Sequence, residues 1–156
     1  MIPALLLLAL QSADRLPPAN PLPYADPAAA AVMAPIDAMF RGLAAHDGAA
    51  ILAQVRPEGG ATVVVETAQG ARSVRHMTWT AFAAGVKPGP DRIEEKLTDA
   101  AIEVDGDIAM VWGPYVFTVN GKLHHCGVNH FDLIREGGAW KVLNVTWSQR
   151  TTGCPA

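Results

Sequence analysis

The stretch KLHHCGVNHFDLIREGGAWKVLNVTWSQR, residues 122–150, decides how this chain folds. Two runs of alternating polar and apolar residues, 122–136 and 140–150, flank the small residues GGA, a pattern typical of a β-hairpin. Because side chains alternate between the two faces of a strand, the three histidines and the cysteine near its start cannot all lie together. The sequence therefore predicts a hairpin with two chemically different faces rather than one His/Cys cluster.

The apolar residues of the second strand identify the face that is buried. Leu143, Val145 and Trp147 alternate with polar residues, so we expect them to face the interior. A loop of three residues, 137–139, pairs the strands so that this row meets the apolar row of the first strand. The predicted pairs are Glu136 with Trp140, Leu133 with Leu143, Phe131 with Val145, and Asn129 with Trp147.

This register assigns the residues of the His/Cys stretch to faces. His125 and Asn129 are expected to point inward, whereas His124, Cys126 and His130 are expected to point outward. A metal site made of the three outward residues is not expected, because no carboxylate–histidine spacing supports it and a disulfide would consume the sulfur.

The dipeptide Asn120-Gly121 predicts a two-residue turn to the preceding strand, residues 107–119. Such a turn pairs Val119 with Lys122 and therefore Trp112 with Asn129, which places Trp112 inside. A few polar groups among aromatic and aliphatic walls are typical of a small-molecule pocket. The predicted ligand-binding residues are Trp112, His125, Asn129, Phe131, Val145 and Trp147.

The rest of the chain is expected to begin with two helices, followed by two strands, 61–67 and 71–77, around the turn AQG, and then by a third short helix. Asp26-Pro27 is a helix-start signal, and Pro35 inside the following apolar stripe means that the helix either kinks there or begins there. Asp47 and Thr78 are expected to cap two further short helices. From residue 92 onward the chain predicts an antiparallel meander, in which Glu94 and Glu95 are read as a solvated strand face. This order predicts an α+β fold.

The phrases VDGDIAMVWGPYVFTVNGKLHHCG and NHFDLIREGGAWKV, with the closing hairpin GGAWKVLNVTW, resemble the nuclear transport factor 2-like superfamily. This superfamily includes SnoaL-like cyclases and ketosteroid isomerases, and the resemblance, to small and largely uncharacterised bacterial members, covers roughly residues 28 to 150. It implies a cone, in which N-terminal helices pack in a strongly curved antiparallel sheet around a pocket.

The catalytic acids of these enzymes have no counterpart at the matching positions. The inward acid of ketosteroid isomerases matches Asn129, and the acid on the last strand of SnoaL-like cyclases matches Trp147. An amide can donate a hydrogen bond but cannot exchange a proton. The resemblance therefore favours binding over catalysis.

Length and charge limit the classes of function. A chain of 156 residues is expected to form one domain, and a net charge of −3 without a basic stripe argues against a nucleic-acid partner. The sequence predicts no cofactor. The expected partner is a small, largely apolar molecule, with a homodimer left open.

The N-terminal residues are unlike the rest of the chain. MIPALLLLALQSA, residues 1–13, resembles a secretory signal peptide but lacks a positive n-region, and its apolar run is far shorter than the roughly 20 residues of a membrane span. A mis-assigned start or a short lipid-touching tail are the alternatives. A Pro-rich linker, residues 14–26, precedes the domain expected over 27–150, and 151–156 form a C-terminal tail. We expect a periplasmic or secreted protein.

The two cysteines, Cys126 and Cys154, suit an oxidising compartment. A disulfide between them is predicted, the alternative being two reduced thiols, one of them buried.

The function expected from the sequence is binding of a small molecule inside the cone. One alternative is an enzyme on the same fold, an isomerase, dehydratase or cyclase, that uses His125 as general base near neutral pH. Another alternative is a non-catalytic dimerisation or interaction module.

Overall fold

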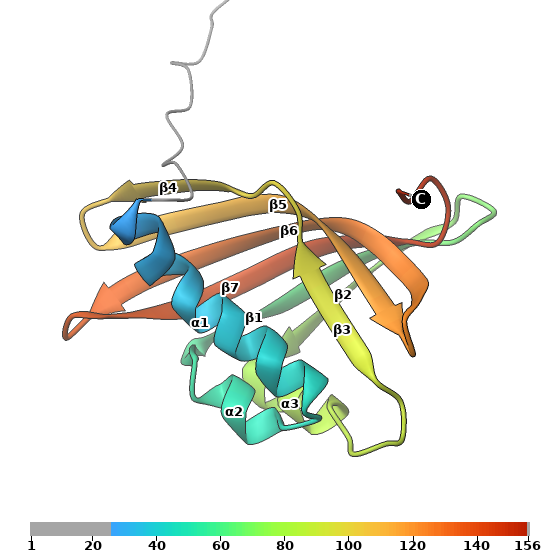
Figure 1. Cartoon of the computed structure of the whole chain (residues 1–156), viewed down its shortest axis with the longest axis horizontal. Coiled ribbons are helices and arrows are strands. Elements are labelled where there is room, and N and C mark those ends of the chain that lie inside the picture. The colour runs from blue at the N-terminus through green and yellow to red at the C-terminus, as the bar shows by residue number, and fades with distance from the viewer. Residues whose placement is uncertain (1–25, 156) are drawn as a thin grey trace, which may run out of the picture.

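The computed structural model describes residues 26–155, in which three helices, two before the first strand and one after the second, cover one face of a seven-stranded sheet (Figure 1). The leader and most of the linker expected from the sequence lie outside the described residues. The elements are α1 (Pro27–Ala44), α2 (Gly48–Leu52), β1 (Val55–Glu66), β2 (Arg72–Thr78), α3 (Trp79–Gly85), β3 (Ile93–Leu97), β4 (Ala101–Asp105), β5 (Ile108–Val119), β6 (Lys122–Glu136) and β7 (Ala139–Arg150). No helix in the described part of the chain is long and apolar enough to cross a membrane.

The helices begin where the sequence predicts. Asp26 and Asp47 accept hydrogen bonds from the free backbone N–H groups of α1 and α2, and Thr78 does the same for α3. Pro35 lies inside α1, which runs unbroken from Pro27. Of the two alternatives for this helix, a start at residue 35 is therefore wrong.

The sheet has the strand order β2-β1-β7-β6-β5-β3, with β4 also pairing with β5. This confirms the α+β class and the curved sheet wrapped on helices. One detail differs, because β1 and β7 run parallel and make the sheet mixed. The predicted strand after Arg92 is also divided into β3 and β4, with Asp99 in the left-handed conformation (φ 55°) between them.

The turn between β6 and β7 is shorter than predicted, yet the pocket register is correct. Gly137 and Gly138 both have positive φ and form a two-residue turn, so Glu136 pairs with Ala139. A bulge at Leu143 then restores the offset by one residue. Phe131 consequently faces Val145 and Asn129 faces Trp147 as predicted, whereas the predicted pairing of Leu133 with Leu143 is wrong, since Leu133 pairs with Val142.

The β5–β6 register differs from the prediction because of a second bulge. The Asn120-Gly121 turn and the pair Val119–Lys122 are confirmed. After the pair Thr118–Leu123, however, His124 on β6 has no partner on β5, and the next pair is Phe117–His125. Trp112 therefore pairs with His130 and is 51% exposed on the outer face. The prediction that Trp112 lines the interior is wrong, and Phe117 lies opposite His125 instead.

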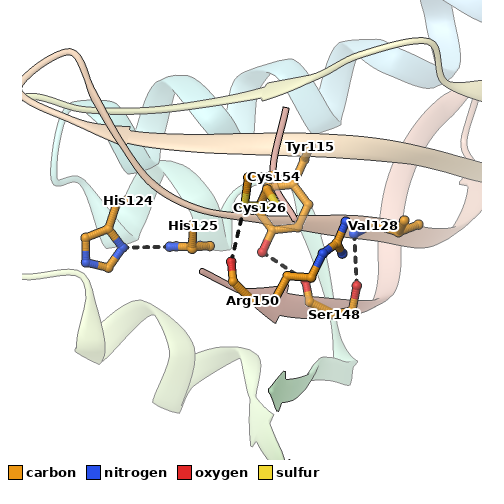
Figure 2. Close-up of a disulfide and its surroundings, with 8 residues drawn as sticks. All are labelled: Tyr115, His124, His125, Cys126, Val128, Ser148, Arg150 and Cys154. Carbon is orange, nitrogen blue, oxygen red and sulfur yellow. Dashed lines mark hydrogen bonds between the residues drawn. A yellow bond between two sulfur atoms is a disulfide. The ribbon is translucent and has the colours of Figure 1, made fainter. Parts of the chain in front are cut away.

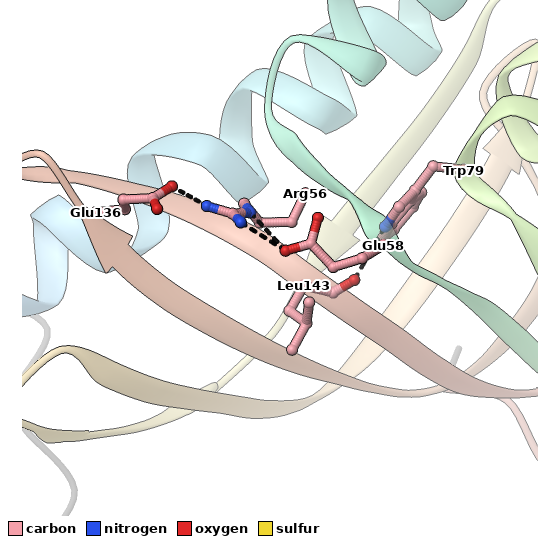
Figure 3. A network of polar contacts seen from close by, with 5 residues as sticks. All are labelled: Arg56, Glu58, Trp79, Glu136 and Leu143. Atoms are coloured by element: carbon pink, nitrogen blue, oxygen red, sulfur yellow. Dashed lines mark hydrogen bonds and ion pairs between the residues drawn. The ribbon is translucent and has the colours of Figure 1, made fainter.

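Polar contacts fix the helical end of the molecule to the sheet (Figure 3). The indole N–H of Trp79, which is almost fully buried at the start of α3, donates to the carbonyl oxygen of Leu143 at 2.9 Å. This carbonyl belongs to the residue at the β7 bulge. On β1, Arg56 forms ion pairs with Glu58 and with Glu136 at the end of β6. The Trp79 bond fastens α3 to the sheet, and the ion pair of Arg56 with Glu136 links the start of β1 to the end of β6 within it.

The C-terminal tail returns to β6 through the predicted disulfide (Figure 2). Cys126 and Cys154 are bonded, and the Cys126 side chain is buried on the face opposite the helices. The residues between the two cysteines include most of the β6–β7 hairpin, so the bond closes a covalent loop around the strands that form the pocket.

Candidate functional site

A cavity of about 180 Å³ lies between the helices and the inner face of the sheet. Helix residues form one wall and strand residues form the other. The lining residues are Met39, Phe40, Leu43, Ile51, Phe82, Glu95, Phe117, His125, Asn129, Phe131, Val145, Trp147 and Gln149. Most of these are apolar, which is the usual composition of a small-molecule site.

Five of the six residues predicted to bind ligand line this cavity. They are His125, Asn129, Phe131, Val145 and Trp147. They are brought together by the β6–β7 register, because Asn129 and Phe131 lie directly opposite Trp147 and Val145. Trp112 is the exception, since it lies on the outer face of the sheet.

Glu95 is the polar residue that the sequence interpretation missed. It lies on β3 opposite Phe117, with its carboxyl inside the cavity, so reading it as part of a solvated face is wrong. Its neighbours Glu94 and Lys96 point the other way and pair with each other at 2.9 Å. The signal was present in the sequence, because Ile93 and Leu97 flank Glu95 at a spacing of two and assign it to the apolar face.

Glu95 and Asn129 form a hydrogen-bonded pair in the cavity. Asn129 is 2% exposed and donates from Nδ2 to Oε1 of Glu95 at 2.6 Å. Glu95 keeps part of its surface accessible toward the cavity, while the protein packed around the carboxyl removes most of its contact with water. This desolvation raises the pKa of Glu95 to about 7, although the bond from Asn129 acts in the opposite direction.

His125 lies at another part of the same wall, stacked on Phe117 with ring centroids 4.6 Å apart. Its Nδ1 is 2.8 Å from Nδ1 of His124, as Figure 2 shows. Burial, with a smaller contribution from His124, lowers the pKa of His125 to about 4. The imidazole is therefore neutral near pH 7, where its low basicity makes it a weaker proton acceptor than the Glu95 carboxylate.

Tyr115 on β5 packs next to His125, with ring centroids 5.7 Å apart. Its hydroxyl donates to the carbonyl oxygen of Ser148 at 3.0 Å (Figure 2). Burial raises the pKa of the Tyr115 phenol further above its ordinary value, and the negative charge of Glu95 adds to this effect. The phenol stays protonated and links β5 to β7.

The outward residues of the His/Cys stretch are not brought together as a metal-binding group. Cys126 is bonded to Cys154, so its sulfur is not available as a ligand. His130 instead lies 3.4 Å from Asp132 and packs near Trp112, with ring centroids 5.7 Å apart. Within residues 26–155 no three His, Cys, Asp or Glu side chains are placed to hold a metal ion.

Comparison with known proteins identifies the fold. The chain resembles the structure of the beta subunit of a candidate aromatic-ring-hydroxylating dioxygenase from Novosphingobium aromaticivorans, with a TM-score of 0.64 and 12% identity over 82% of this chain and 92% of the other. An NTF2-like protein with a cystatin-like fold from the same organism gives a TM-score of 0.60 and 16% identity over 81% and 83%. An NTF2-like protein of unknown function from Shewanella baltica gives 0.59 and 11% over 80% and 95%. No family model and no curated protein matches the sequence.

The chain therefore has the nuclear transport factor 2-like, or cystatin-like, cone fold. Identities this low establish the fold alone, and one such fold carries many unrelated functions.

Proposed function

We propose that this protein binds a small, largely apolar molecule in the cavity between the helices and the sheet. The observation that carries this proposal is the cavity of about 180 Å³, with walls mainly of aliphatic and aromatic side chains and one buried polar pair. A cavity of roughly 150 Å³ with apolar walls is large enough for benzene, so a molecule with one ring and a short substituent matches this size.

The test uses two tryptophans on opposite sides of the same sheet. Trp147→Ala removes a cavity wall, whereas Trp112→Ala removes an exposed indole from the outer face. Native mass spectrometry of protein from its own host should identify a bound small molecule, and titration should then show weaker affinity for Trp147→Ala only. Equal affinity in both variants would contradict binding in this cavity.

A second candidate function is proton transfer, with Glu95 rather than His125 as the acid or base. The observation in its favour is the raised pKa of Glu95, about 7, which lies close to neutral pH where a general base is most effective. Asn129 would hold the carboxyl in place through its bond to Oε1. The reactions compatible with one such group are isomerisation and dehydration.

The two candidates differ in what happens to the bound molecule. If the protein is an enzyme, Glu95→Gln should lower turnover roughly 100-fold or more while affinity changes little. Recovering the molecule chemically unchanged after long incubation with the original protein would support binding alone. Conversion that persists in Glu95→Gln and stops in His125→Ala would return the role of base to His125.

We also propose that the protein is exported. The Cys126–Cys154 bond supports this, since disulfides persist mainly in oxidising compartments. Expression in bacteria followed by intact mass analysis of the periplasmic fraction should show loss of residues 1–13. Full-length protein confined to the cytoplasm would contradict export.

A further inference from the structure

The Glu95 carboxyl in the cavity has no opposite charge beside it. None of the ion pairs formed by the described residues includes Glu95, and its only hydrogen-bond partner there is Asn129. No buried polar side-chain atom in this part of the chain lacks a partner, so the second carboxyl oxygen reaches the open space of the cavity. Buried carboxylates are normally paired with a cation.

The free polar atoms at this point of the cavity are hydrogen-bond acceptors. When Glu95 is ionised, Asn129 must present its amide N–H₂ to Oε1, which leaves Oδ1 of the amide as an acceptor. The other carboxyl oxygen accepts as well. Gln149, which also lines the cavity, carries both donors and acceptors and therefore favours neither a donating nor an accepting ligand. A molecule that complements Glu95 and Asn129 must therefore bring donors.

No cation among the described residues supplies the missing positive charge: Arg150 on β7 lowers the pKa of Tyr115, but no cation shifts the pKa of Glu95. His125 on β6 is neutral near pH 7, and Tyr115 on β5 keeps its proton. On α1, which packs against β3, the ionisable residues Asp37 and Arg41 are exposed to solvent. The titration of the cavity near neutral pH is consequently that of Glu95.

The walls suit a positively charged group attached to an apolar body. Phe40, Phe82, Phe117, Phe131 and Trp147 all border the cavity. The faces of aromatic rings contact apolar groups favourably and also attract ammonium groups. The attraction of an ammonium group is stronger where water is excluded.

We propose that the cavity selects a small lipophilic amine, bound as its ammonium ion against Glu95 and Asn129 with its apolar part among the aromatic rings. This inference rests on the proposed function and specifies the class of ligand. The alternative is a neutral carbonyl compound that accepts a hydrogen bond from protonated Glu95. The two ligand classes predict opposite effects of pH, because the ammonium needs the carboxylate and the carbonyl needs the acid.

The experiment compares 2-phenylethylamine with 2-phenylethanol, which share shape but differ in charge at pH 8. Calorimetric titration at constant ionic strength should show the amine binding at least tenfold more tightly than the alcohol at pH 8. Its affinity should fall about tenfold from pH 8 to pH 6, because a carboxyl with pKa about 7 is then ionised in only about one molecule in eleven.

Two variants locate the effect. Glu95→Gln should remove both the preference for the amine and its pH dependence, and Gln is close in size to protonated Glu, so the cavity should persist. Glu94→Gln, its neighbour on the outer side of β3, should behave as the original protein. Loss of the preference in both variants would contradict a specific role for Glu95.

The remaining outcomes separate this inference from the proposed function. Equal binding of the two probes at pH 8, or an amine affinity that rises toward pH 6, would overturn selection of an ammonium ion and leave small-molecule binding standing. Failure of both probes to bind to folded protein would overturn both proposals for a one-ring ligand.

Discussion

At the scale of single residues, Glu95 determines the chemistry of the cavity. A carboxyl on an apolar face is costly to ionise, and the packing that creates the cavity is what removes this group from water. Ionisation of Glu95 therefore destabilises the ligand-free protein, and a ligand whose positive charge compensates the carboxylate removes this destabilisation when it binds. Glu95 is therefore expected to affect stability as well as binding.

Glu95 should make the ligand-free protein less stable as pH rises. Its folded pKa of about 7 exceeds its ordinary value of 4.5, so the folded state holds a proton that the unfolded state has lost between these values. The free energy of unfolding should fall by up to about 3 kcal/mol as pH rises through this window. Above the folded pKa, Glu95 should cause no further change in stability with pH. Urea denaturation of Glu95→Gln and the original protein, between pH 5 and pH 8, measures the difference.

The comparison variant is Glu94→Gln, since Glu94 is exposed and lies on the opposite side of the strand. It should leave the fall in stability intact. A difference between Glu95→Gln and the original protein that stays constant from pH 5 to pH 8 would show that the carboxyl is not buried as described.

At the scale of elements, the register of β7 decides which side chains face the cavity. Val145 is 6% exposed and pairs with Phe131, whereas its neighbour Thr146 is exposed and pairs with His130. Val145→Asp should destabilise the protein by about 3 kcal/mol or more, because a charge would be left unpaired among apolar groups. Thr146→Asp should change stability by about 0.5 kcal/mol at most. Thermal melts that rank the two in the reverse order would show that the faces are exchanged.

The approach of β6 to β7 depends on a glycine. A Cβ at Gly127 would lie 1.8 Å from the carbonyl oxygen of Ser148, where the ladder is interrupted and Val128 N–H donates to the Ser148 hydroxyl (Figure 2). Gly127→Ala should therefore force the strands apart and lower the free energy of unfolding by about 1–3 kcal/mol or more, as overpacking of a core does.

Gly85, at the end of α3, is the matched control for this substitution. No atom lies within 4 Å of a Cβ there and its φ is not positive, so Gly85→Ala should leave the melting temperature nearly unchanged. Similar melting temperatures for the two variants would contradict the close contact of β6 with β7.

At the scale of the whole molecule, the disulfide fastens the C-terminal tail to the sheet that forms the cavity. Because the bond closes a loop that contains most of the β6–β7 hairpin, its removal in the double variant Cys126→Ala/Cys154→Ala should cost about 2–4 kcal/mol. Denaturation with and without reductant should give the same difference in the original protein.

Thiol accessibility gives an independent check of the bond. Protein produced in the bacterial periplasm and alkylated without reductant should show no added mass. Alkylation of both cysteines in folded protein would rule out the disulfide and weaken the proposal of export.

The sequence by itself determined the order of elements, the helix starts and the inner row of β6 and β7 up to the bulge at Leu143, where Val142 takes the inner position. Capping residues, turn dipeptides and period-two alternation are local signals, and they act within a few residues of the positions they specify. This is why five of the six predicted ligand-binding residues, among them Asn129 and Trp147, line the cavity.

The tertiary structure decided what the local signals leave open. A bulge at His124 displaces the β5 register by one residue, and because strand faces alternate, this single displacement moves Trp112 to the solvent and Phe117 to the cavity. The parallel pairing of β1 with β7 likewise joins segments that are distant in sequence. The chemistry of Glu95 was decided in the same way. Its alternation with Ile93 and Leu97 is visible in the sequence, but only the tertiary packing around the cavity removes its carboxyl from water and raises its pKa, against the opposing effect of the hydrogen bond from Asn129.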